Sequence, residues 1–135
     1  MDMKGNYLMG KIEFDAVILE CKSPKALSRF YAALLDYKPR YNEGEEWRDI
    51  ISSDGMIKLA FQYNEDYIPP VWPDQKGKPQ MMMHLDFKVK NQDELKQAVT
   101  KALSLGAILT DAQFGGDDWV TLIDPEGHPF CFVIW

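Results

Sequence analysis

The feature that most constrains the fold of this chain is an internal repeat. Hydrophobic periodicity and the positions of glycine and proline show strand, helix and turn signals twice, in the same order. We assign the first copy to residues 11–65 and the second to 81–135, joined by a proline-rich linker at 66–80 and preceded by an extension at 1–10. Because a unit of about 55 residues buries too little surface to fold alone, both copies are expected to pack into one domain over 11–135.

Matched residues support the repeat. Ala16 corresponds to His84 at a separation of 68 residues, and Trp47 corresponds to Trp119 at a separation of 72. An insertion of four residues in the second copy accounts for the difference.

The first copy is predicted to form a βαβββ module. Alternating apolar residues from Ile12 through Phe14 to Ile18 predict a central strand that is covered on both faces. Ser23 followed by Pro24 predicts the start of an amphipathic helix. Further strands are expected at 39–41, 47–51 and 56–63.

The second copy repeats this order. Asn91, with Glu94 three residues later, predicts a helix start, and Gly106 predicts its end. Strands are expected at 82–89, 107–110, 119–123 and 129–135. The predicted fold class is therefore α+β, with two tandem βαβββ modules forming one cupped mixed sheet, the helices outside and the concave side open to a small molecule.

Composition and charge exclude several classes of function. The net charge is −6 and the pI about 4.8, so no binding to nucleic acid or to an anionic membrane surface is expected. No apolar run approaches the roughly 18 residues that span a bilayer, and residues 1–10 lack the apolar segment of a secretory signal. Two isolated cysteines fit a reducing compartment, and we predict a cytoplasmic protein. Phosphate-binding, dinucleotide-binding and serine-hydrolase motifs are absent from the sequence.

Four motifs together carry a family resemblance: Phe30-Tyr31, His84-Leu85-Asp86-Phe87, Leu105-Gly106-Ala107 and the run from Asp124 to Phe130. Through them the chain resembles the vicinal oxygen chelate (VOC) superfamily, which includes glyoxalase I, extradiol dioxygenases, fosfomycin-resistance enzymes and bleomycin-binding proteins. It is most similar to the small glyoxalase-like proteins. The resemblance covers nearly the whole chain and implies a homodimer.

The resemblance also implies where a metal would bind. Enzymes of the superfamily hold a divalent metal through four strand positions, which fall here on Ala16 and near Leu59 in the first module and on His84 and Cys131 in the second. Only His84 is a usual ligand at its position. We therefore predict no cofactor and no intact metal site. A divalent metal bound through His84 and Cys131, with the carbonyl oxygen of Gln62, is the alternative.

The predicted ligand site lies in the cup. Trp47 and Trp119 are expected either to enclose a planar ligand or to fix their own hairpins. Trp72 either covers the cup or fixes the linker, and His84 is a ligand contact, an acid or base, or a residue bonded to backbone. Cys131 is expected to be part of the wall rather than a nucleophile. The predicted ligand-binding residues are His84, Trp47, Trp119, Gln62, Cys131 and Trp72, with His84 the one catalytic candidate.

Three hypotheses of function follow. The first is a protein that binds a small, partly apolar or aromatic molecule without an obligatory metal. The second is a lyase, isomerase or dioxygenase that uses a metal or His84. The third is an interaction module whose cup is filled by its own side chains. His128, in the turn before the last strand, is expected to be solvated and to take no part.

Overall fold

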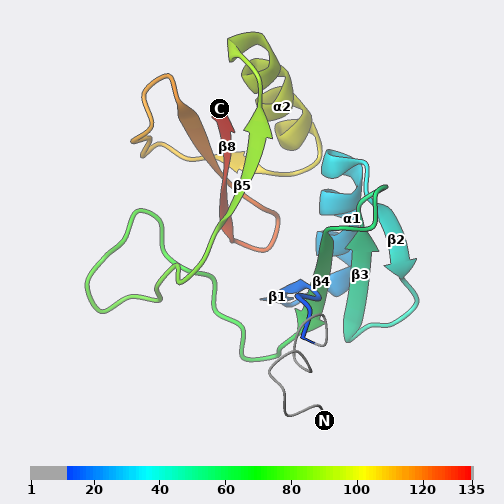
Figure 1. Cartoon of the computed structure of the whole chain (residues 1–135). Helices are drawn as coiled ribbons and strands as arrows, with labels where there is room; N and C mark the ends of the chain where they lie inside the picture. Colours follow the sequence, from blue (N-terminus) through cyan, green and yellow to red (C-terminus); the bar gives the residue numbers. More distant parts are fainter. Residues whose placement is uncertain (1–11, 135) are drawn as a thin grey trace, which may run out of the picture.

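Two similar four-stranded sheets form the framework of this computed structural model, which describes residues 12–134 (Figure 1). Module one contains β1 (Val17–Cys21), α1 (Pro24–Leu35), β2 (Lys38–Tyr41), β3 (Trp47–Ile51) and β4 (Lys58–Tyr63). Module two contains β5 (Leu85–Val89), α2 (Gln92–Ser104), β6 (Ile108–Leu109), β7 (Trp119–Ile123) and β8 (Pro129–Ile134). The predicted α+β fold of two tandem βαβββ modules is confirmed. The strands form two hydrogen-bonded sheets, one per module, and not the single sheet predicted, because no described strand of one module pairs with a strand of the other.

Both sheets have the same strand order. It is β1-β4-β3-β2 in module one and β5-β8-β7-β6 in module two. In each sheet the first strand pairs in parallel with the last, and the other pairs are antiparallel. A parallel pair cannot be closed by a tight turn, so the intervening helix and two strands supply the long connection.

Capping residues determine where both helices begin. The Ser23 hydroxyl accepts a hydrogen bond from the Ala26 amide at 3.1 Å, and Pro24 opens the first turn. Asn91 Oδ1 accepts from the Glu94 amide at 2.9 Å. Both predicted helix starts are thereby confirmed. Within residues 12–134, neither helix is long and apolar enough to cross a bilayer.

The first strand differs from its prediction. β1 is an edge strand that pairs only with β4, not a central strand. Ile12 and Phe14 precede it and are 78% and 82% exposed, whereas Val17, Leu19 and Cys21 face the core. Because both alternating sets of residues are apolar here, periodicity alone could not identify the buried face.

One hydrophobic core runs through both modules. Tyr31 of α1 is fully buried, and its ring stacks on Phe61 of β4 with the centroids 5.9 Å apart. The same ring lies 6.0 Å from the rings of Phe87 in β5 and Phe130 in β8. Besides covering the sheet of module one, α1 therefore forms part of the contact between the modules.

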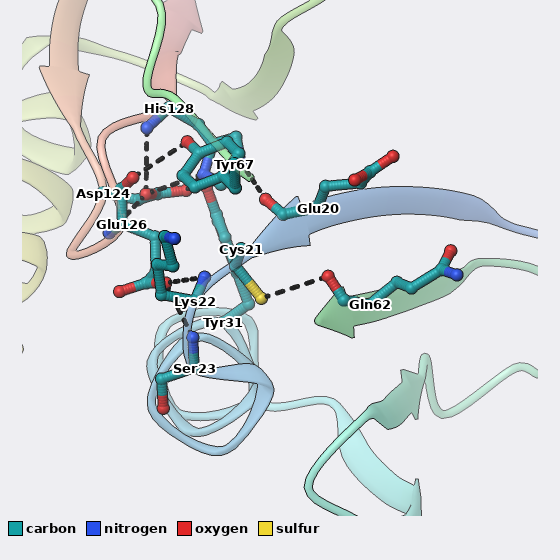
Figure 2. A network of polar contacts seen from close by, with 10 residues as sticks. All are labelled: Glu20, Cys21, Lys22, Ser23, Tyr31, Gln62, Tyr67, Asp124, Glu126 and His128. Atoms are coloured by element: carbon teal, nitrogen blue, oxygen red, sulfur yellow. Dashed lines mark hydrogen bonds and ion pairs between the residues drawn. The ribbon is translucent and has the colours of Figure 1, made fainter. Parts of the chain in front are cut away.

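A polar network also joins the modules, at the turn between β7 and β8 (Figure 2). Asp124 is 1% exposed and accepts a hydrogen bond from the Tyr31 hydroxyl at 2.7 Å. His128 Nδ1 lies 2.8 Å from Asp124 Oδ2, and His128 Nε2 lies 2.7 Å from the carbonyl oxygen of Glu20 in β1. A carboxylate and a carbonyl only accept, so both ring nitrogens carry hydrogen and His128 is an imidazolium.

The prediction that His128 is solvated is therefore wrong. Its side chain is 14% exposed, and the ring of Tyr67, from the linker, stacks on it at 5.2 Å. Burial opposes the charge of His128, but the hydrogen bond and charge of Asp124 outweigh burial and raise its pKa. The neighbouring Glu126 carboxylate accepts from the Ser23 amide at 2.8 Å, at the start of α1. We name Tyr31, Tyr67, Asp124, Glu126 and His128 the junction network.

Candidate functional site

A cavity of about 620 Å³ lies over the sheet of module two. It is lined by residues of the linker and its continuation to β5, of the loop before β7 and of the strands β5, β7 and β8: Trp72, Met81, His84, Asp86, Phe114, Asp118, Trp119, Thr121, Pro129, Cys131, Val133 and Ile134. No described residue of module one lines it. The cavity is thus built by module two and the chain segments around it.

Strand register assembles the floor of the cavity. Asp86 of β5 lies opposite Cys131 of β8, which lies opposite Thr121 of β7. Side chains alternate along a strand, so these three share the face opposite that of Phe130, which lies in the core. His84 lies two residues before Asp86 and reaches the same cavity. We name His84, Asp86, Thr121 and Cys131 the polar floor.

The groups of the polar floor contact one another. His84 Nε2 lies 3.1 Å from Asp86 Oδ1, and Thr121 Oγ1 lies 3.3 Å from Cys131 Sγ. Burial raises the pKa of the Cys131 thiol, the hydrogen bond from Thr121 opposes this, and the Asp86 charge adds to it. A thiol with a raised pKa stays protonated at neutral pH, which supports a wall position for Cys131 rather than a nucleophilic one.

Three aromatic side chains, Trp72, Phe114 and Trp119, form the aromatic walls of the cavity. The rings of Trp72 and Phe114 meet edge to face with centroids 5.8 Å apart, and Trp72 Nε1 donates to the carbonyl of Ala112 at 3.2 Å. Trp119 lies against Gly115, where an added Cβ would be 2.5 Å from the indole ring. Glycine is thus required at 115 while Trp119 keeps this position.

Gln113 holds the loop that carries Phe114. Its Nε2 donates to the Thr121 carbonyl at 2.7 Å, and its Oε1 accepts from the Thr121 amide at 2.9 Å. The side chain thereby pairs with β7 as a neighbouring strand would. The predicted site did not include Gln113, Phe114 or Asp86. Gln113 and Phe114 lie in a loop, which has no periodic pattern. Asp86 lies two residues after His84 in the same motif, and this spacing could have added it to the site.

Two predicted site residues lie outside the cavity. Trp47 of β3 and Gln62 of β4 are opposite each other in the sheet of module one. Trp47 Nε1 donates to the Asp49 carboxylate at 3.2 Å, and Arg40 binds the same carboxylate at 2.7 Å. This fits the alternative in which Trp47 fixes its own hairpin. The structure thus brings together His84, Trp72, Trp119 and Cys131, and places Trp47 and Gln62 elsewhere.

The two modules fill the superfamily's metal positions differently. In the parallel pair β5–β8, Asp86 lies opposite Cys131. In the corresponding pair β1–β4, Ile18 lies opposite Ala60. The counterpart of Cys131 in module one is therefore Ala60, the neighbour of the predicted Leu59. An alanine side chain has no atom that binds a metal.

Module two nevertheless offers three ligand atoms. One each from His84, Asp86 and Cys131 lie within 4.8 Å of one another, and Asp86 is the member that the sequence prediction lacked. A set of nitrogen, oxygen and sulfur donors suits zinc and similar transition metals better than magnesium or calcium. The residues therefore fit a three-ligand site within one module, not the four-position site shared by both.

Solved structures share this fold. Protein ATC0852 from Agrobacterium tumefaciens matches with a TM-score of 0.67 and 21% identity, over 92% of this chain and 98% of that one. A glyoxalase/bleomycin resistance/dioxygenase family enzyme from Burkholderia phytofirmans matches at 0.65 and 20%, over 87% and 94%. The fosfomycin resistance protein FosX from Mesorhizobium loti matches at 0.63 and 14%, over 91% of each chain. These likenesses define the class: a VOC fold.

A model of the glyoxalase-like domain family matches residues 16–133. The chain therefore belongs to the glyoxalase-like domain family, and the resemblance to the VOC superfamily is confirmed. No curated protein matches the chain.

Proposed function

We propose that the protein binds a small, partly apolar or aromatic molecule between the aromatic walls and the polar floor. One observation carries the proposal: a cavity of about 620 Å³ in which apolar walls converge on a few polar groups. This combination is typical of small-molecule sites. The open volume also argues against an interaction module whose cup is filled by its own side chains.

The proposal is tested with 2-naphthylmethanol, a neutral aromatic probe, in buffer that contains a chelator. Binding is followed by NMR through the indole N–H resonances. We expect those of Trp72 and Trp119 to shift and that of Trp47, outside the cavity, to stay in place.

Matched variants locate the probe. Trp119→Leu removes the indole and keeps an apolar side chain, and we expect it to weaken probe binding about tenfold. Trp47→Leu makes the same change in module one and is expected to leave affinity unchanged. Equal affinities for wild type and Trp119→Leu, or shifts confined to Trp47, would overturn the proposal.

A second candidate is metal-assisted chemistry in a lyase, isomerase or dioxygenase. It is favoured by the three donor atoms of His84, Asp86 and Cys131 at the edge of an open cavity. Three protein ligands beside an open position are the usual pattern of catalytic zinc sites, where the ion polarises a substrate oxygen. His84, Asp86 and Cys131 would hold the ion, and the fold would keep Asp86 beside His84.

Cobalt titration tests this candidate without an assay of activity. We expect one Co²⁺ per chain, with a near-ultraviolet absorption band from cobalt bound to sulfur. Cys131→Ser is expected to abolish the band, and His84→Ala to lower affinity at least about tenfold. Cys21→Ser is the control, because Cys21 is buried elsewhere and burial raises the pKa of its thiol to about 12. A band that disappears in Cys21→Ser, or no band in wild type, counts against the candidate.

The predicted homodimer concerns the surface around β1. Ile12, Phe14 and Ile18 are exposed there, beside a strand edge. Exposed apolar side chains that lie close together favour association with a second chain. Sedimentation of the wild type is expected to give twice the chain mass of 15.6 kDa. The variant Phe14→Glu is expected to shift the protein toward the mass of the monomer. A monomeric wild type contradicts the prediction.

A further inference from the structure

We infer that the molecule bound in the cavity is an organic cation, an amine or quaternary ammonium on an aromatic or otherwise apolar body. The inference rests on the proposed function and adds the charge of the ligand to it. It follows from three features of the described lining: its charged residues, its aromatic side chains and the state of its hydrogen-bond donors.

Apart from His84, whose Nε2 contacts Asp86, the charged residues that line the cavity are acidic. Asp86 in the polar floor and Asp118 beside Trp119 both line the cavity, whereas none of the lining residues between 12 and 134 is lysine or arginine. The Asp86 side chain is 47% exposed, so a ligand can reach it. The chain as a whole carries −6. Such a site attracts cations and repels phosphates and carboxylates.

The aromatic walls suit the same ligand. The face of an indole or benzene ring carries negative charge density, and aromatic side chains arranged around a site bind ammonium groups through it. Trp72, Phe114 and Trp119 line one cavity, and Gly115 and Gln113 fix the positions of two of them. Aromatic rings and carboxylates in the same cavity thus both favour a positively charged ligand.

The hydrogen-bond donors of the polar floor are engaged with other protein groups. Thr121 Oγ1 and Cys131 Sγ share a hydrogen bond, and His84 Nε2 lies beside Asp86. An anionic ligand would compete with Asp86 and Cys131 for these donors. A cation instead meets carboxylate oxygens, each of which accepts further hydrogen bonds.

Three probes with one body and different charges test the inference: 2-naphthylmethylammonium, 2-naphthylmethanol and 2-naphthoate, each titrated in chelator by calorimetry. We expect the ammonium to bind about tenfold more tightly than the alcohol, and the carboxylate to bind most weakly. Equal binding of ammonium and alcohol, or tightest binding of the carboxylate, overturns the inference while the proposed function stands. Binding by none of the three removes the proposed function itself, and the inference with it.

Charge-neutralising variants identify the groups responsible. Asp86→Asn and Asp118→Asn are each expected to lower the ammonium-to-alcohol affinity ratio about threefold, because each loses an attraction that only the charged probe feels. Asp118 is exposed in a loop, so its variant keeps the test valid if Asp86→Asn does not fold. Asp36→Asn is the control: it removes the same charge from an exposed left-handed position of module one that asparagine tolerates. An equal fall of the ratio in Asp36→Asn would show that only the net charge matters and would contradict the inference.

Discussion

At the scale of single residues, Asp124 has the most consequences for the structure. Its buried carboxylate accepts hydrogen bonds from Tyr31 of module one and from His128 of its own turn. Burial and the nearby Asp124 charge raise the pKa of Tyr31 well above its usual value, so the phenol is protonated and donates at neutral pH. A carboxylate in the interior is stable only with such donors around it.

Removal of one donor has a predictable cost. Tyr31→Phe keeps the stacked ring and loses the hydroxyl, and we expect the free energy of unfolding in urea to fall by about 1–2 kcal/mol. Tyr63→Phe makes the same change at an exposed residue of β4 and is expected to stay within about 0.5 kcal/mol of wild type. Equal losses in both variants would refute a special role for the Asp124 bond.

Sequence reasoning reached part of the site at this scale. His84 and Cys131 were found because the superfamily pattern marks their positions. Strand alternation puts Asp86 on the same face as His84, but its position opposite Cys131 depends on the register of β5 and β8, which no spacing along the chain reveals. His128 was misjudged for a similar reason: its partner Glu20 is 108 residues away in sequence.

At the scale of elements, local signals were sufficient where local contacts decide the structure. Ser23 and Asn91 begin their helices as predicted, since a cap bonds within three residues. β1 was predicted to be a central strand covered on both faces and is an edge strand with one face in the core, because its place depends on the distant β4 and on the core. Before β7, the glycines and Asp117-Asp118 indicated a loop near Trp119 at the mouth of the pocket, but nothing in the sequence marked Phe114 as a wall of the cavity.

The close contact between Gly115 of that loop and Trp119 can be tested. Gly115→Ala puts a methyl group against the Trp119 carbonyl oxygen and 2.5 Å from its indole ring, so both the backbone and the ring of Trp119 must move. We expect a displaced Trp119 indole resonance and weaker binding of the naphthyl probes, by about tenfold. Gly116→Ala is the control: nothing lies within 4 Å of its added Cβ, and its positive φ costs about 1 kcal/mol of stability. An unmoved Trp119 resonance in Gly115→Ala would be the contrary result.

At the scale of the whole molecule, the two modules have the same fold but different roles. Module two carries the polar floor and most of the cavity, whereas the matching positions in module one hold Ala16 and Ala60. Module one instead supplies Tyr31 and the Glu20 carbonyl to the junction network. The repeat was evident from the sequence. The different roles of the two modules were not, because they depend on which side chains face the shared core.

The junction network predicts a dependence of stability on pH. The folded-state pKa of His128 is raised above its unfolded value of about 6.5, so its stabilisation is complete below that pH and is lost as pH rises through the folded-state pKa. His128→Gln should be about 3 kcal/mol less stable than wild type near pH 6, with a smaller difference near pH 9. Urea unfolding at both pH values measures this.

The control for this prediction is His84→Gln, which changes a partly exposed histidine outside the network. It should lose much less stability than His128→Gln near pH 6, because its side chain is 39% exposed and its contact with Asp86 is screened by water. A difference between wild type and His128→Gln that stays constant from about pH 6 to about pH 9 would contradict the charged state assigned to His128.

The junction network also has a consequence for the order of events on the ribosome. The segment that supplies Asp124, Glu126 and His128 is translated only after module one, the linker and most of module two. Until then the nascent chain offers the Tyr31 hydroxyl and the start of α1 no partner from that turn. Until that turn is translated, the first module lacks these hydrogen bonds and is less stable in the nascent chain than in the finished molecule.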